Sequence, residues 1–114
     1  MTQTSLKTTA QYLTESLVEL LNNLWRVDDI ESGRNPYQYL SIEEGRKYNK
    51  LVVNFYEPTR PDQRSVYCFI DKVSGAVYKA ASWKSPAKGI RFYVEQLVET
   101  PLMCDRFGSF LYQR

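Results

Sequence analysis

The sequence contains no histidine and only two cysteines among its 114 residues. Histidine is the commonest general base and a frequent metal ligand, so its absence excludes Ser-His-Asp and Cys-His catalytic systems within this chain. Cys68 and Cys104 alone cannot fill the four ligand positions of a structural zinc site. We therefore expect neither a metal nor another cofactor, and we do not expect an enzyme.

Long apolar runs are also missing. No stretch approaches the roughly 20 residues that a membrane-spanning helix needs, and Met1–Lys7 lacks the apolar core of a secretory signal. These absences predict a cytoplasmic protein without membrane contact. In that reducing setting Cys68 and Cys104 are expected as buried free thiols, with a single disulfide as the alternative.

Apolar and aromatic residues are plentiful, at 43% and 14% of the chain, which indicates a folded protein. The length predicts a single domain over residues 1–114.

The net charge of +2 conceals an uneven distribution. Residues 1–45 hold three basic and seven acidic side chains, whereas residues 46–114 hold twelve basic and six acidic ones. The basic half could attract nucleic acid, and solvated surface charge is the alternative interpretation.

The N-terminal segment predicts a helix, with Thr8 and Gln11 matching a capping box at its start. Apolar side chains recur at steps of three and four, which puts them on one face: Leu6, Ala10, Leu13, Leu17, Leu20, Leu21 and Leu24. We expect this face to cover a sheet, with a seam against a second copy as the alternative. Residues 27–46 carry turn signals and are expected as a packed connector or a functional lid.

Three strands are predicted next, over Lys47–Glu57, Arg64–Ile70 and Ala76–Ala81, with Pro58 and Pro61 ending the first. A turn at Asp71–Gly75, with Gly75 in the left-handed conformation, joins the last two. It would pair Ile70 with Val77, Phe69 with Tyr78, Cys68 with Lys79 and Tyr67 with Ala80. Both faces of this hairpin are largely apolar, so we expect a helix on each face, or a partner on one.

Ser85 and Pro86 are suited to the N-cap and first turn of a second helix that ends before Pro101. The apolar tail Leu102–Arg114 should pack back on the domain, for example as a short strand. The expected fold is therefore of the α+β class. It has an N-terminal helix, a three-stranded antiparallel meander, a second helix and a short packed C-terminal tail.

The densest group of chemically useful side chains lies at the predicted junction between the third strand and the second helix. A helix N-terminus favours anions, lysines add charge, and an indole offers a stacking face for a base. The candidate anion- or nucleic-acid-binding residues are Lys79, Ser82, Trp83, Lys84, Ser85, Lys88 and Arg91. The alternative is that Trp83 fills the core and the lysines are merely solvated. The segment is not a P-loop, and no catalytic residues are assigned.

The segment Asp71–Arg91 has the pattern D-K-x-[ST]-G-x-x-x-K-x-A-S-W-K-x-P-A-K-x-x-R. It resembles a stretch found in small uncharacterised proteins of tailed bacteriophages, including marine ones. The ending Arg106–Arg114 is loosely similar to the aromatic, glycine-containing ending of that family. The resemblance implies a phage or environmental origin and a host-cell cytoplasm, but no activity.

Two functional hypotheses follow. The first is a small non-enzymatic binding protein that contacts nucleic acid or another anion through its basic C-terminal half. The alternative is a protein–protein interaction module that binds a host or phage protein, or a second copy of itself as a homodimer. The leucine stripe and the two-sided apolar hairpin favour that alternative, and an enzyme is the least favoured class.

Overall fold

The computed structural model of the chain describes residues 7–56 and 64–112. The order of elements is helix α1 (Thr9–Glu31), strands β1 (Gln38–Glu44), β2 (Tyr48–Phe55), β3 (Ser65–Asp71), β4 (Ala76–Tyr78) and β5 (Phe92–Tyr93), helix α2 (Val94–Glu99), and the 3₁₀ turns η1 (Pro101–Met103) and η2 (Ser109–Tyr112). The five strands form one antiparallel sheet in sequence order. The α+β prediction is confirmed, but the sheet has five strands rather than three.

Helix α1 begins at the predicted capping box. The backbone N–H of Gln11 donates to the Thr8 hydroxyl at 3.1 Å, and the Gln11 side chain accepts from the N–H of Thr8 at 2.9 Å. Leu17 and Leu21 are completely buried, so the apolar stripe covers the sheet as predicted, but its predicted member Leu20 is 39% exposed and lies off the buried face. Leu6, its predicted first member, lies outside the described residues. The helix runs to Glu31, further than the apolar stripe indicated.

The predicted meander is confirmed in β2, β3 and the start of β4, although Glu57, Pro58 and Pro61 lie outside the described residues. Ile70 pairs with Val77 and Phe69 with Tyr78, as the Asp71–Gly75 turn predicted. The further pairs Cys68–Lys79 and Tyr67–Ala80 are wrong, because β4 ends at Tyr78. There the chain leaves the sheet, and Ala80 bridges to Pro86 instead.

Strand β1 was not predicted, because the turn signals in residues 27–46 indicated a connector. It pairs with β2 along its whole length, from Gln38 opposite Phe55 to Glu44 opposite Asn49. Asn22 of α1 holds it in place, since its side chain accepts from the N–H of Leu40 at 2.7 Å and donates to its carbonyl at 3.0 Å. Of the turn signals in residues 27–46, residues 32–36 lie in the link between α1 and β1 and Gly45 lies in the β1–β2 turn, whereas Asp28 and Asp29 belong to α1.

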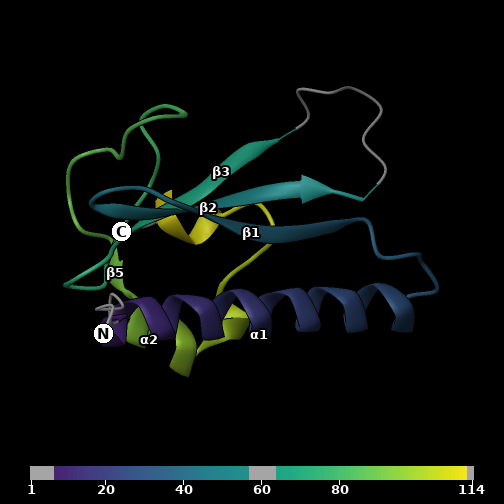
Figure 1. Cartoon of the computed structure of the whole chain (residues 1–114). Coiled ribbons are helices and arrows are strands. Elements are labelled where there is room, and N and C mark those ends of the chain that lie inside the picture. Colours follow the sequence, from purple (N-terminus) through teal and green to yellow (C-terminus); the bar gives the residue numbers. More distant parts are fainter. Residues whose placement is uncertain (1–6, 57–63, 113–114) are drawn as a thin grey trace, which may run out of the picture.

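The second helix is much shorter than predicted and begins at Val94, not near Ser85 and Pro86. Residues 92–93 form β5 instead, and Gly89 has a φ of +98°, which breaks helical geometry. Both helices lie on one side of the sheet (Figure 1). The prediction of a helix on each face is wrong. The described chain places no helix on the opposite face, which we call the open face.

The C-terminal tail packs into the core as predicted, but as the 3₁₀ turn η2 rather than a strand. Phe110 and Leu111 are buried, and the Phe110 ring meets Tyr67 and Phe92 with centroids 6.0 and 5.5 Å away. A β-bulge at Tyr67 lets β3 present this ring to the core, where it also meets Trp25. In Figure 1 the yellow tail runs between the sheet and the helices.

Candidate anion-binding groove

Residues 79–87 form a narrow, hairpin-like excursion, which we call the Trp83 loop. The N–H of Ala87 donates to the carbonyl of Lys79 at 2.8 Å, and the N–H of Ala81 donates to that of Ser85 at 3.0 Å. The hydroxyls of Ser82 and Ser85 lie 3.0 Å apart and close the tip. This segment is not a helix N-terminus, so the predicted anion site of that kind does not exist here.

Trp83 at the tip of the loop lies against two cations of the sheet. The Lys50 ammonium is 3.9 Å from its ring centroid, and the Arg64 guanidinium carbon is 5.3 Å from it. The indole remains 40% exposed, so Trp83 does not fill the core. Because Lys50 lies over the ring, a cation occupies one face of the Trp83 indole, and that face is not free for stacking.

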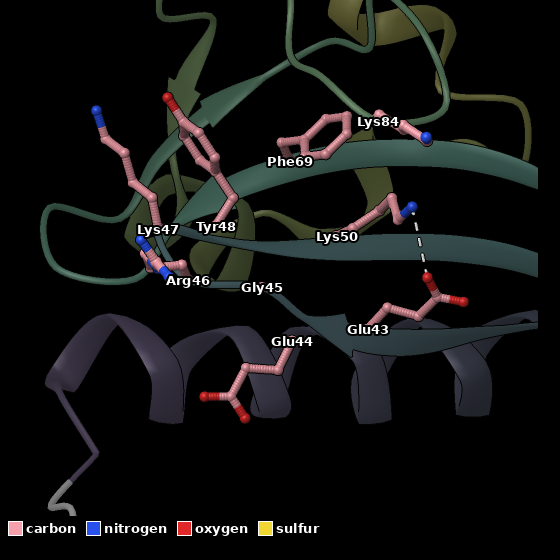
Figure 2. Close-up of a pocket in the computed structure, with 9 residues that line it drawn as sticks. All are labelled: Glu43, Glu44, Gly45, Arg46, Lys47, Tyr48, Lys50, Phe69 and Lys84. Carbon is pink, nitrogen blue, oxygen red and sulfur yellow. Dashed lines mark ion pairs between the residues drawn. The ribbon is translucent and has the colours of Figure 1, made fainter.

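A pocket of about 310 Å³ opens beside this contact (Figure 2). Its walls come from the β1–β2 turn, the open face of β2 and β3, and the Trp83 loop. The lining residues are Glu43, Glu44, Gly45, Arg46, Lys47, Tyr48, Lys50, Phe69 and Lys84. We call this pocket the basic groove. Lys84, on the Trp83 loop, and Lys47, on the β1–β2 turn, both belong to its wall.

Glu43 and Glu44 neutralise only part of this charge. Glu43 forms ion pairs with Arg64 and, at 3.4 Å, with Lys50. The hydrogen bond that Glu43 accepts from Arg64 holds the pKa of the Glu43 carboxyl below its usual value, and the hydrogen bond from Lys50 adds a smaller effect in the same direction. In Figure 2 the Glu44 carboxylate points to the opposite side of β1, and its ion-pair partner is Lys72.

Three groove cations have no acidic partner within residues 7–56 and 64–112: Arg46, Lys47 and Lys84. Among the described lining residues, basic side chains therefore outnumber acidic ones at the groove. Cations that line one groove raise the local concentration of anions around it.

Aromatic rings form the floor of the basic groove. The Tyr48 ring meets Phe69 and Tyr78 edge to face, with centroids 6.0 and 5.7 Å away. Phe69 is only 4% exposed, whereas Tyr48 is half-buried and the Lys47 ammonium lies 5.4 Å from its ring. The groove therefore combines cations with one partly accessible aromatic face.

The structure divides the predicted site residues. Trp83 and Lys84 belong to the basic groove and its border, while Ser82 and Ser85 shape the turn that carries them. Lys79 lies at the base of the loop, with its ammonium 4.7 Å from the Tyr112 ring. Lys88 is exposed and Arg91 is half-buried, and neither lines the groove.

The other residues that line the groove were not among the candidates from the sequence, namely Glu43, Glu44, Gly45, Arg46, Lys47, Tyr48, Lys50 and Phe69. Arg64, which contacts Trp83 at the border, was not a candidate either. The sequence did hold one signal for this site, because the alternation of side chains along β2 puts Tyr48 and Lys50 on the same side of the strand. The pattern could not show that this side is the open face.

The described part of the chain contains no group of three or more histidine, cysteine, aspartate or glutamate residues placed to hold a metal ion. Cys68 and Cys104 are both buried as free thiols, as the sequence predicted. Among the described residues, neither helix has the combination of length and apolar composition required to cross a membrane.

The chain was compared with family models, curated proteins and solved structures. The model of a family of unknown function (DUF7717) matches residues 1–113. Neither a curated protein nor a solved structure matches the chain.

Proposed function

The chain belongs to this family of unknown function, and we propose from its own geometry that it is a small binding protein that holds nucleic acid in the basic groove. The observation that carries the proposal is that Arg46 and Lys47 at one end and Lys84 at the other line one groove with an aromatic floor. Cations from a β-turn and from the Trp83 loop would contact phosphates.

The aromatic floor favours nucleic acid over a simple anion. Phosphate contacts supply most of the affinity of such complexes, and base–aromatic stacking adds affinity without requiring a particular sequence. Tyr48 is the groove ring that is partly accessible for stacking. An inorganic anion would use the cations and leave this ring without a role.

Titration of fluorescently labelled single-stranded DNA and RNA at two salt concentrations tests the proposal. Binding is expected to weaken with salt, because each neutralised phosphate releases a counterion. Lys84→Gln should reduce the slope of log K against log salt by about one unit. Arg26→Gln removes the same charge from an exposed position on α1 and is the matched control. No binding at low salt, or binding that is indifferent to salt, would refute the proposal.

A second candidate function is self-association through an apolar groove between α1 and η1. This groove has a volume of about 310 Å³, and Leu24, Val27 and Leu102 are among its lining residues. Leu102 is 87% exposed at the same place. Two copies related by a two-fold axis could each place Leu102 in the other's groove. Light scattering would show a dimer that Leu102→Asp converts to a monomer, and a monomeric native chain would exclude this function.

The similarity of Asp71–Arg91 to tailed-phage proteins supports a phage origin and a host-cell cytoplasm as the place of action. Phage genes on both sides of the coding sequence are the expected finding, and a bacterial gene neighbourhood would contradict this origin.

A further inference from the structure

Two tyrosines lie together at the far end of the strands that form the basic groove. Tyr39 of β1 and Tyr56, just after β2, have ring centroids 4.7 Å apart, and Tyr56 is 56% exposed. The register pairs Tyr39 with Asn54 and Glu43 with Lys50. Because side chains alternate along a strand, Tyr39 and Glu43 share one face, and the tyrosine pair lies on the open face with the groove.

Arg64 lies between the tyrosine pair and the groove. Its Nε donates to the Asn54 side chain at 3.0 Å, and its other end pairs with Glu43. Its guanidinium carbon is 5.3 Å from the Trp83 ring, and its side chain is 42% exposed. Between Lys50 and Tyr56 the β2 side chains on this face, Val52 and Asn54, are buried, so the accessible groups along the path are Tyr48 at one end, Arg64 between and Tyr56 at the other end.

We propose that the ligand is single-stranded nucleic acid, and that it follows the open face of β1 and β2 from the basic groove to the Tyr39–Tyr56 pair, where a second base stacks. This inference rests on the proposed function. From Tyr48 to Tyr56 the strand covers about 26 Å at roughly 3.3 Å per residue. A strand of at least about four nucleotides suits that path, at the lower end of the site sizes of other single-strand-binding folds.

Duplexes do not suit this face. In a double helix the bases are stacked on each other and paired, so a protein ring can stack only on an unpaired base. Exposed tyrosines beside cations are a platform for unpaired bases and phosphates together. A polyanion without bases could use Arg46, Lys47 and Lys84 but would gain nothing from Tyr56.

The test uses the full chain with labelled oligothymidylates of two and eight nucleotides and with a duplex of eight base pairs. Tyr56→Leu should weaken binding of the eight-nucleotide strand about tenfold, because it removes one stacking face. It should leave binding of the two-nucleotide strand unchanged, and Tyr56→Phe should bind like the native chain. Tyr12→Leu, at an exposed tyrosine of α1, is the matched control.

Each failure has a distinct pattern. If Lys84→Gln lowers the slope of log K against log salt by about one unit but Tyr56→Leu leaves binding of the eight-nucleotide strand unchanged, the path to the tyrosine pair is wrong and the proposed function stands. Equal affinity for the duplex and the single strand, or for polyglutamate and the single strand, overturns the single-strand assignment. If no oligonucleotide binds at low salt, both proposals fail. The melting temperatures of the variants show whether each is folded.

Discussion

The ammonium of Lys50 lies 3.9 Å from the centre of the Trp83 indole ring and donates a hydrogen bond to the Trp83 carbonyl at 2.9 Å. The Lys50 side chain is only 14% exposed. This double contact joins the Trp83 loop to the middle of β2. It explains why the tip of this loop, which has only the single Ala80–Pro86 bridge as regular pairing, lies at the border of the basic groove.

We expect Lys50 and Trp83 to be energetically coupled. A double-mutant cycle of Lys50→Met and Trp83→Leu should give a coupling energy of about 0.5–2 kcal/mol in denaturant unfolding, as for a partly desolvated cation–π contact. Lys47→Met combined with Trp83→Leu is the control and should show no coupling. Additive effects in the Lys50 cycle would contradict the prediction.

The buried carboxylate of Asp29 predicts a large effect for Arg106. Asp29 is 1% exposed near the negative end of α1, and Arg106 reaches it from the C-terminal tail at 2.8 Å. Arg106→Met would leave this charge without its main partner and should cost about 3–5 kcal/mol of unfolding free energy. Arg34→Met should cost less, because Arg34 is half exposed. Equal costs in denaturant titrations would contradict this ranking.

The same ion pair predicts an acid dependence of stability. The hydrogen bond from Arg106, opposed by desolvation and aided by Arg34, lowers the pKa of Asp29 below 3.8. A lowered native pKa contributes stability that is complete above the unfolded pKa and is lost as the pH falls through the native pKa. In Asp29→Asn the unfolding free energy should therefore fall less steeply below about pH 4. An unchanged acid slope would exclude this contribution.

Gly75 should be hard to replace. Its φ is +78°, and an added Cβ would lie 3.1 Å from Cγ1 of Val94. Gly75→Ala adds this crowding to left-handed strain and should lower the melting temperature more than Gly33→Ala. Gly33 has the same φ with no heavy atom within 4 Å of its Cβ position, so it is the matched control. Equal shifts would show that the α2 contact is unimportant.

The two cysteines should be unreactive in the folded protein. Burial raises the pKa of the Cys68 thiol above its usual value. Burial, together with the smaller effect of the negative charge of Asp105, raises the pKa of the Cys104 thiol to about 12. The thiolate is the reactive form, so neither should react with a thiol reagent such as DTNB at neutral pH. Two equivalents should react in denaturant. Rapid labelling of the native chain would contradict this prediction.

Much of the local structure was predictable from the residues. The capping box at Thr8 and Gln11 and the Gly75 turn depend on neighbours in the chain, and both were confirmed. Strand β1 was missed because its turn-rich surroundings hid a strand that β2 and Asn22 complete. The second helix was overextended because the cap and proline signals at Ser85 and Pro86 were stronger than the single glycine that follows.

The sequence by itself determined the α+β class, the burial of Leu17 and Leu21 in the leucine stripe and the hairpin register, because periodicity and turn chemistry are local properties. It also indicated Trp83 and Lys84 as candidates. Only the tertiary structure decided that Lys84 and the Arg46–Lys47 turn line one groove, and that Lys50 lies over Trp83. These contacts join residues far apart in the chain, and the physical reason for them is the antiparallel pairing of β1, β2 and β3 together with both helices on one side.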